Sequence, residues 1–240
     1  MNLAGKTITG KRSHNEDSYF AGMLNGTPVV AVSDGMGGHA AGETASRISI
    51  ETLCAVLEQN RPVTEGGLIA AFSKANAAVY DTAGQNEAMF GMGATLVCAV
   101  LSPARFLAAN VGDSRLYLFH GGSIRQVSHD HSYVAELVRR GIITSEEAKT
   151  HPRRNLITRA VGTEPTVRTD LFSDAWAPGD ILLLCSDGLS GSLSEAEMAY
   201  LLLSTQDLDQ ACALLIDRAF ENGSTDNITV VLARNAEDAK

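Results

Sequence analysis

Four aspartates stand where apolar segments end, and their positions suggest that they share one site. Asp34, Asp113, Asp187 and Asp226 each adjoin an apolar run that is typical of a strand. Taken singly, an Asp-Gly pair after a strand is usually only a turn, because Asp tolerates the left-handed conformation that Gly favours. Several converging carboxylates, however, repel one another unless a cation neutralises them. Such oxygen ligands suit Mg²⁺ or Mn²⁺, so the pattern favours a site for hard cations.

Two further segments could complete such a site. The glycine-rich residues 34–38 follow a buried-strand pattern and could offer a carbonyl oxygen to an ion. They are not a phosphate-binding P-loop, because no Lys-Ser/Thr pair follows them. Arg12 stands a few residues before Glu16 and Asp17. Alone, this is typical of a solvated loop of mixed charge, but beside a carboxylate cluster an arginine is the natural bidentate partner of a phosphate.

Histidine and cysteine do not indicate a zinc site. The segment His129-Asp-His131 lacks the further ligands of a closed zinc site and is typical of a polar loop. The four cysteines share no C-x-x-C spacing and lie inside apolar runs. This is typical of small buried core residues in a reducing compartment.

Length and charge narrow the class of protein. The chain has 240 residues, of which 45% are hydrophobic, and no repeat or linker divides it, so we expect one domain over residues 1–240. Its 19 basic and 28 acidic residues give a formal charge of −9, which argues against nucleic acid and anionic membrane surfaces as partners. No secretory signal pattern and no long apolar run occur. We therefore expect a cytoplasmic protein that accepts an anionic substrate only through local positive charge.

The apolar patterns predict clustered strands rather than a strict alternation with helices. Strands are expected at residues 18–24, 28–33, 94–101, 105–111, 115–119, 123–127, 181–185 and 228–233, and helices at 42–59, 66–82, 131–140 and 206–222. Asn25-Gly26 predicts a hairpin turn, and Ser194-x-x-Glu197 predicts a capping box that opens another helix. The order favours an α+β fold, a layered sandwich of two mainly antiparallel sheets with helices outside.

Residues 131–165 interrupt the strand pattern. The stretch is polar, carries a Thr144-x-x-Glu147 capping box and includes the adjacent Arg153 and Arg154. We expect it to be an insertion that lies on the domain rather than in its core.

The motifs together resemble those of the metal-dependent serine/threonine protein phosphatases of type 2C (the PPM family). The matching segments are Arg12-x-x-Asn15-Glu16-Asp17, Asp34-Gly-Met-Gly-Gly38, Gly93-Ala-Thr95, Gly112-Asp-Ser-Arg115, Ser186-Asp187-Gly188-Leu189 and Asp226-Asn227. A single D-G-x-G-G motif is weak evidence for a family, but these six segments follow the family's order over almost the whole chain, which is strong evidence. The resemblance implies a four-layer α-β-β-α sandwich with a binuclear Mn²⁺ or Mg²⁺ centre between the sheets. It also implies that residues 131–165 form the family's flap beside the active site.

The resemblance implies a set of metal ligands. Asp34 would bridge both ions, and the carbonyl oxygen of Gly35 would bind the first. Asp187 and Asp226 would bind the second. In several bacterial members a third, weaker ion involves the aspartates that match Asp113 and Asp187.

The resemblance also implies roles for the N-terminal segment. Glu16 and Asp17 would shape the site, Glu16 through a metal-bound water, and Arg12 would hold the substrate phosphate. Some members carry His in the third position of D-G-H-G-G, and it has been assigned as the general acid. Here that position is Met36, which cannot donate a proton. Because the bacterial branch is similar there, we still expect an enzyme, with a metal-bound water as the preferred acid.

Three functions remain open from the sequence. The leading hypothesis is a monomeric enzyme that hydrolyses phosphoserine and phosphothreonine in proteins, with a binuclear centre that activates a bridging water. It would reverse the action of a cognate Ser/Thr kinase in signal transduction. Arg153 and Arg154 would guide acidic phosphopeptides to the site. One alternative is a catalytically silent phosphoprotein-binding module, which the presence of Asp34, Asp187 and Asp226 disfavours. The other is a hydrolase of small phosphoesters with the same site chemistry.

Overall fold

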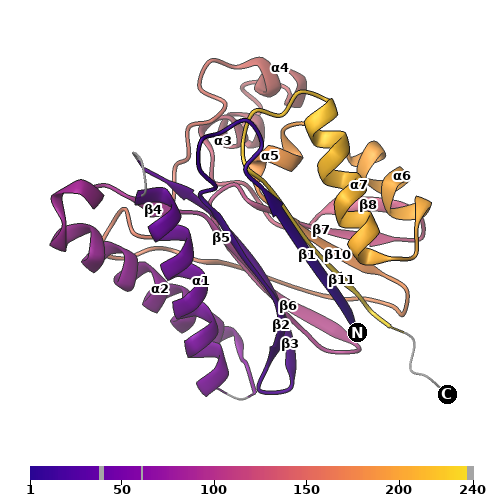
Figure 1. Cartoon of the computed structure of the whole chain (residues 1–240), viewed down its shortest axis with the longest axis horizontal. Coiled ribbons are helices and arrows are strands. Elements are labelled where there is room, and N and C mark those ends of the chain that lie inside the picture. Colours follow the sequence, from indigo (N-terminus) through magenta and orange to yellow (C-terminus); the bar gives the residue numbers. More distant parts are fainter. Residues whose placement is uncertain (38–40, 61, 237–240) are drawn as a thin grey trace.

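Two antiparallel sheets face each other, and helices cover their outer faces (Figure 1). The computed structural model describes residues 1–37, 41–60 and 62–236. One sheet has the order β1 (Asn2–Ile8), β11 (Ile228–Arg234), β10 (Ile181–Cys185), β7 (Arg115–His120) and β8 (Ser123–Gln126). The other has the order β2 (Asp17–Leu24), β3 (Thr27–Met36), β5 (Leu96–Leu101), β6 (Arg105–Val111) and β9 (Asp170–Ala175), with the short β4 (Gly93–Ala94) beside β3. The predicted α+β sandwich is confirmed.

Each sheet has its own pair of covering helices. Helices α1 (Ala41–Gln59) and α2 (Glu65–Gln85) pack on the sheet of β2 and β3, and α6 (Glu195–Ser204) and α7 (Leu208–Glu221) pack on the sheet of β1 and β11. Side chains that precede the helices satisfy their first amide groups, because the first turn of a helix has no internal partners. Thr64 caps α2, Asp207 caps α7, and Ser194 forms the predicted capping box with Glu197 at α6.

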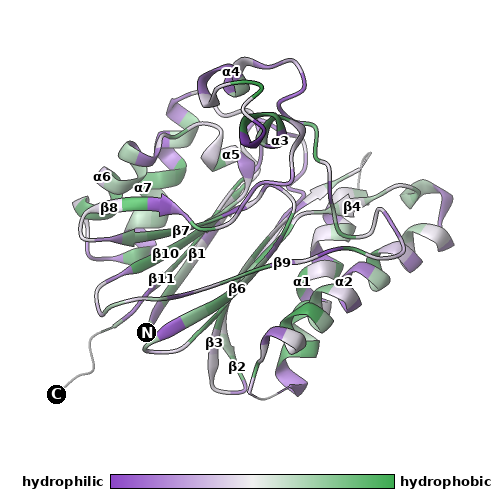
Figure 2. Ribbon diagram, turned by 180° about the vertical axis from the view of Figure 1, so that it is seen from behind, coloured by the Kyte–Doolittle hydropathy of each residue, from purple (hydrophilic) through white to green (hydrophobic). Residues whose placement is uncertain are grey.

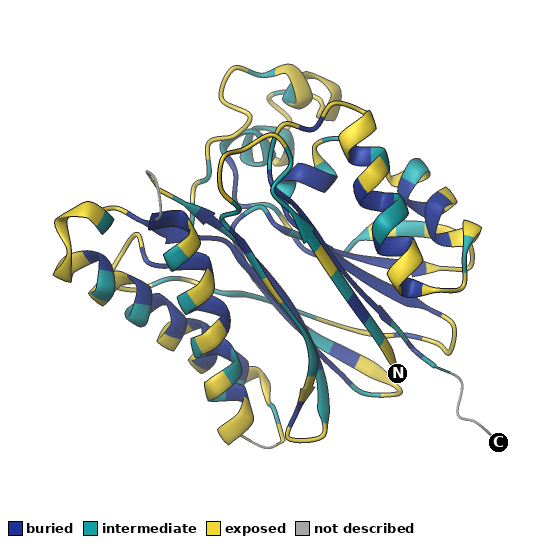
Figure 3. Cartoon of the chain, in the orientation of Figure 1, coloured by how far each residue is buried: buried dark blue, intermediate teal, exposed yellow. Residues whose placement is uncertain are grey.

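Three apolar layers fill the spaces between the four layers of secondary structure. Leu53 and Phe72 belong to the layer beneath α1 and α2, and Leu215 belongs to the layer beneath α6 and α7. Along β10, Leu183 faces those helices whereas Leu184 faces the opposite sheet. The central strands are therefore buried on both faces, which explains why their sequences are almost continuously apolar (Figures 2 and 3).

The insertion over residues 131–165, called the flap below, lies at one end of the sandwich (the top of Figure 1). It contains α3 (Tyr133–Arg139) and α4 (Ser145–Thr150), neither of which has a buried residue. The predicted capping box of Thr144 and Glu147 opens α4. The two flap helices thus stand outside the three apolar layers, as the polar sequence predicts, whereas Val161 near the end of the flap is buried in the layer beneath α1 and α2.

Several elements differ from the sequence prediction. The strands β1 and β9 were not predicted, because both are edge strands that are buried at few positions and lack a clear apolar pattern. The short helix α5 (Asp187–Ser190) and the 3₁₀ turn η1 (Glu87–Met89) were also missed. Asp187 therefore opens a helix rather than only ending a strand. Among the described residues, no helix combines the length and the apolar character needed to cross a membrane.

Candidate active site

The strand pairing brings the predicted site residues to the end of the sandwich beside the flap. In one sheet Asp17 lies directly opposite Asp34 in the β2–β3 register. In the other sheet Asp187 follows β10 and Asp226 precedes β11, and these strands are antiparallel neighbours. The four carboxylates thus come from both sheets, as predicted for a site between them. Asp113, in the turn between β6 and β7, lies at the edge of this acidic cluster and interacts electrostatically with Asp187.

Asp17 connects the two sheets. Its Oδ2 atom accepts hydrogen bonds from Ser186 Oγ at 2.8 Å and from Thr229 Oγ1 at 2.6 Å. Ser186 directly follows β10 and Thr229 lies in β11, and both strands belong to the opposite sheet. The Oδ1 atom of Asp17 is buried and has no hydrogen-bond partner among the described residues. Burial, with a smaller contribution from the nearby carboxylates, raises the pKa of Asp17 to about 7. A buried carboxylate with a free oxygen atom is a fitting ligand for a cation.

The pKa values of Asp34, Asp113 and Asp187 are raised as well. Burial and then repulsion from Asp17 and Asp187 raise the pKa of Asp34 well above its ordinary value. Burial and the charge of Asp226 raise the pKa of Asp187 to about 6, and its carboxyl group lies within hydrogen-bonding reach of Asp34. Burial and Asp187 raise the pKa of Asp113 to about 7. Metal binding requires deprotonated ligands, so cations would displace these protons.

The backbone around Gly35 leaves no room for a side chain. A Cβ atom at this position would lie 2.0 Å from the carbonyl oxygen of Gly42. The Gly35 amide donates to Glu16 O at 3.0 Å. The Thr95 amide donates to Asp34 O at 2.8 Å, and the Asp34 amide donates to Thr95 Oγ1 at 2.9 Å. These contacts fix the start of the predicted glycine-rich loop. Gly38, its last residue, lies outside the described residues.

Glu16 and Arg12 lie at the more open side of the site. Burial and the charge of Asp226 raise the pKa of Glu16, and Arg12 opposes the shift. Arg12 Nη2 donates to Asp226 Oδ2 at 2.7 Å, and these two side chains are 53% and 34% exposed. A guanidinium group that is half exposed beside an acidic cluster can reach a phosphate from solvent.

Asn227 positions the N-terminal segment, a role that was not predicted from the sequence. Its Oδ1 atom accepts from Glu16 N at 2.8 Å, and its Nδ2 atom donates to Thr9 O and His14 O, both at 2.9 Å. Asn227 is only 4% exposed. The loop that carries Arg12 is thereby attached to the start of β11. A polar residue next to an apolar strand was the available signal, but the sequence does not show which backbone it would meet.

The donor set fits hard divalent cations. Carboxylates from both sheets, the Gly35 carbonyl and the free Asp17 Oδ1 atom supply oxygen ligands, and no thiol or imidazole is among the predicted ligands. Among the described residues, no three His, Cys, Asp or Glu side chains form a ready cage around a single point. Ions here would therefore complete their coordination with carbonyl oxygens and water, as Mg²⁺ commonly does.

A cavity of about 300 Å³ lies between the glycine-rich loop and the flap. Met36 lines it from the glycine-rich loop, and Arg159, Thr163 and Arg168 line it from the flap and the segment that follows. The cavity is connected to the acidic cluster through Met36, which follows Asp34 by two residues.

Known proteins resemble this chain over nearly its whole length. Residues 4–227 match the family model described as protein phosphatase 2C. The serine/threonine phosphatase Stp of Listeria welshimeri is 38% identical over 240 residues, covering 97% of this chain and 95% of that protein. The crystal structure of Stp1 from Staphylococcus aureus is 36% identical with a TM-score of 0.92, covering 97% and 94% of the two chains. The catalytic domain of PstP, solved in complex with two manganese ions, is 34% identical with a TM-score of 0.86, covering 97% of both.

Proposed function

This chain belongs to the protein phosphatase 2C family and is a serine/threonine phosphatase, and on that premise we propose that it hydrolyses phosphoserine and phosphothreonine in proteins with two Mn²⁺ or Mg²⁺ ions. The convergence of Asp17, Asp34, Asp187 and Asp226 between the sheets carries this proposal. When bound, the ions would lower the pKa of a shared water and neutralise charge on the phosphate. The manganese ions in the related PstP structure support the choice of metal.

We assign the ion ligands according to their positions. Asp34 would contact both ions and the Gly35 carbonyl the first, as the family resemblance implies, and the last residues of β3 carry both groups into the cluster. Asp187 and Asp226 would hold the second, since they flank adjacent strands. Asp113 would contribute to a third and weaker ion at the edge of the cluster.

The remaining residues orient the substrate and the ligands. Arg12 would bind the phosphate oxygens with its planar guanidinium group, exchanging its contact with Asp226 for one with the substrate. Asp17, bonded to Ser186 and Thr229, would keep the two halves of the site in register. Glu16 would orient a water at the open side. Met36 cannot donate a proton, so the leaving alkoxide would take its proton from water in the site.

The flap would contribute to recognition of the protein substrate. Arg153 lies 5.6 Å from the ring centre of Tyr133 and so is held in place at the flap surface, next to the exposed Arg154. Replacing both arginines with Glu should raise KM for an acidic phosphopeptide more than for a small aryl phosphate. Equal effects on both substrates would contradict this role.

We further propose the setting in which the enzyme works. The 240 residues would act as one monomeric domain in the cytoplasm, where the substrates would be a Ser/Thr kinase, its targets or both. Size-exclusion chromatography with light scattering tests the monomer, and a dimer at micromolar concentration would contradict it.

The decisive experiment measures phosphate release from a phosphothreonine peptide by metal-stripped protein, with and without Mn²⁺. Activity should appear with Mn²⁺ and fall more than about 100-fold in Asp187→Asn, because several kcal/mol of charge stabilisation are lost. The matched control is Asp81→Asn, an exposed position on α2 that should leave the rate unchanged. Mn²⁺ binding without turnover would favour the silent binding module, and preference for small phosphates in competition would favour the small-phosphoester hydrolase.

A further inference from the structure

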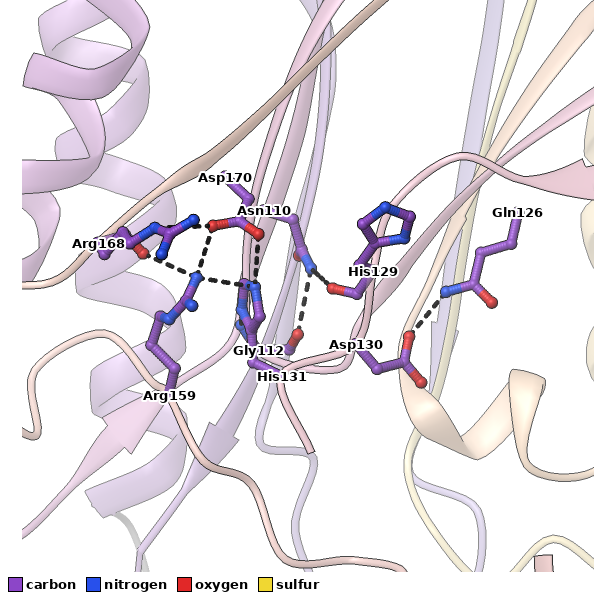
Figure 4. A network of polar contacts seen from close by, with 9 residues as sticks. All are labelled: Asn110, Gly112, Gln126, His129, Asp130, His131, Arg159, Arg168 and Asp170. Carbon is purple, nitrogen blue, oxygen red and sulfur yellow. Dashed lines mark hydrogen bonds and ion pairs between the residues drawn. The ribbon is translucent and has the colours of Figure 1, made fainter. Parts of the chain in front are cut away.

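Both ends of the flap are attached to one buried histidine (Figure 4). His131, 3% exposed, is the first residue of the flap. Its carbonyl oxygen accepts from Thr158 N at 2.8 Å, and a β-bridge joins Ser132 to Ile157. On the returning segment, Arg159 Nη1 lies 2.8 Å from His131 Nε2. The base of the flap is therefore closed around His131.

Asp170, the first residue of β9, holds both members of this contact. Its Oδ1 atom accepts from Arg159 Nη1 at 2.7 Å, and its Oδ2 atom lies 3.2 Å from His131 Nε2. Arg159 also donates to the carbonyl oxygen of Arg168 at 3.2 Å. One carboxylate on an edge strand thus fixes the histidine ring and the arginine together (Figure 4).

The other side of the imidazole ring holds Gly112. The Nδ1 atom of His131 accepts from Gly112 N at 3.0 Å, and the backbone N–H of His131 donates to Gly112 O at 2.9 Å. Asn110 Nδ2 donates to the same oxygen at 3.1 Å. Because Nδ1 accepts an amide hydrogen, the ring proton of the neutral histidine is on Nε2, which donates to Asp170. Arg159 Nη1 is itself only a donor, so it contacts Nε2 without a hydrogen bond to it and is held beside the ring by Asp170. The ring thus links the flap base to Gly112 in one defined orientation.

Gly112 is packed tightly against Thr95, which supports Asp34. Its φ of +107° favours glycine, and a Cβ atom here would lie 2.6 Å from Cβ of Thr95. Thr95 Oγ1 in turn accepts from Asp34 N at 2.9 Å and shares a hydrogen bond of 2.7 Å with Ser114 Oγ. The next residue after Gly112 is Asp113. A shift of this turn would therefore move both Asp113 and the support of Asp34.

We propose that His131, held by Arg159 and Asp170, is a positioning residue that fixes the Gly112–Asp113 turn from the base of the flap and thereby sets the geometry of the acidic cluster. This inference rests on the proposed function, because the property that it controls is cation binding by that cluster. Supporting residues behind metal ligands typically change metal affinity or activity 10–100-fold. The flap is thus attached directly to the ion site rather than only lying beside it.

Titration of metal-free protein with Mn²⁺ by calorimetry tests the link without any turnover. His131→Leu and Arg159→Met should each weaken the weakest-bound Mn²⁺ about tenfold. His131→Asn should recover part of the loss, because the Asn Oδ1 atom can accept from Gly112 N much as Nδ1 does. The control is Arg125→Met, which removes an exposed ion pair to Asp174 on the same strand β9 and should bind Mn²⁺ like the wild type.

Steady-state kinetics provide a second measurement, whose expected result differs from that of a merely structural role. With saturating Mn²⁺, the Arg159→Met variant should recover its kcat, while the Mn²⁺ concentration for half-maximal rate stays raised about tenfold. Circular dichroism checks that each variant folds, and Arg159→Met decides the matter if His131→Leu does not fold.

Three results would overturn the proposal. The first is an Arg159→Met variant that binds Mn²⁺ with wild-type affinity. The second is an equal loss of Mn²⁺ affinity in Arg125→Met, because this would indicate a general weakening of β9. The third is His131→Asn binding Mn²⁺ no better than His131→Leu. A wild-type protein that binds no Mn²⁺ would contradict the proposed function as well, and that outcome is visible before any variant is made.

Discussion

Arg12 and Asp226 form an ion pair in which Nη2 lies 2.7 Å from Oδ2, so a proposed phosphate ligand and a proposed ion ligand neutralise each other at the mouth of the site. Both side chains are partly exposed, so the pair adds little to the stability of the fold. A phosphate that binds Arg12 would compete with Asp226 for the guanidinium group. The contact therefore links substrate binding to the state of an ion ligand.

Arg12→Met should lower kcat/KM for a phosphothreonine peptide about 10–100-fold, because a charge-assisted hydrogen bond contributes about 1.5–3 kcal/mol. The melting temperature should change by no more than about 1 °C, since the pair is exposed. Steady-state kinetics and thermal denaturation measure both. Arg47→Met, which removes another exposed ion pair, to Glu51, is the control and should alter neither quantity. Unchanged kcat/KM in Arg12→Met would exclude Arg12 as the phosphate ligand.

Metal-free protein should become less stable as the pH rises from about 4 to about 7. Folded Asp17, Asp113 and Asp187 keep protons up to a pKa of about 6 or 7, whereas the unfolded chain loses them near 3.8. The unfolded state then binds fewer protons, so the free energy of unfolding falls with rising pH. This stabilisation is complete below about pH 4 and lost above about pH 7. Thermal melts of chelator-treated protein at several pH values measure it, and Mn²⁺ should restore stability near pH 7.

Asp17→Asn separates this effect from others. An amide at this position can still accept from Ser186 and Thr229 but carries no charge. The metal-free variant should melt about 2–4 °C higher than wild type near pH 7.5, equivalent to about 1 kcal/mol, and match it near pH 4. A lower melting temperature near pH 7.5 would show that the charge of Asp17 is compensated within the protein.

Asn227→Ala should destabilise the protein by about 2–4 kcal/mol and reduce activity. It leaves the Glu16 amide and the Thr9 and His14 carbonyls without their buried partner, and each unsatisfied group costs about 1–3 kcal/mol before water enters. Chemical denaturation measures the loss, with Asn155→Ala, an exposed flap position, as the control. A cost below about 0.5 kcal/mol would mean that the N-terminal loop does not depend on Asn227.

Gly35→Ala should abolish activity, whereas Gly84→Ala should be harmless. The new Cβ atom at residue 35 would meet Gly42 O at 2.0 Å, so the backbone that carries Asp34 must move. At Gly84, within α2, no atom lies within 4 Å, and alanine should add about 0.5–1 kcal/mol of stability. Activity assays and denaturation curves of the two variants test the contrast. Retained activity in Gly35→Ala would show that this backbone position is not critical.

The acidic cluster was predictable because each of its aspartates stands at a strand end, and strand ends gather at the edge of a sheet. The roles of Ser186, Thr229 and Asn227 were not predictable, because they depend on contacts between residues that are 169 to 212 positions apart. Nothing local in the sequence indicates that Thr229 within an apolar strand would bond to Asp17. The order of the motifs predicts where the site lies, but only the pairing of the strands shows which side chains hold its residues in position.

His131 shows the same limit from the other direction. Its neighbours His129 and Asp130 are polar, and the segment was interpreted as a polar loop, yet His131 is almost fully buried. Periodicity cannot reveal this burial, because it is produced by Gly112 on one side and by Asp170 on the unpredicted strand β9 on the other. Because β9 was not predicted, the contact of His131 with Asp170, and with it the proposed role of His131, could not be predicted either.

The position of β1 at the edge of its sheet determines when the site can form during synthesis. β1 pairs with β11 alone, and β11 and Asp226 are translated more than two hundred residues after β1. A nascent chain on the ribosome that extends only through α7 has the arginine, the glycine-rich loop and the flap, but neither Asp226 nor the strand that anchors its own beginning. With Asp226 as a proposed ion ligand, a chain that stops before β11 would lack part of the ion site, so translation that stops early would yield an inert product rather than an unregulated enzyme.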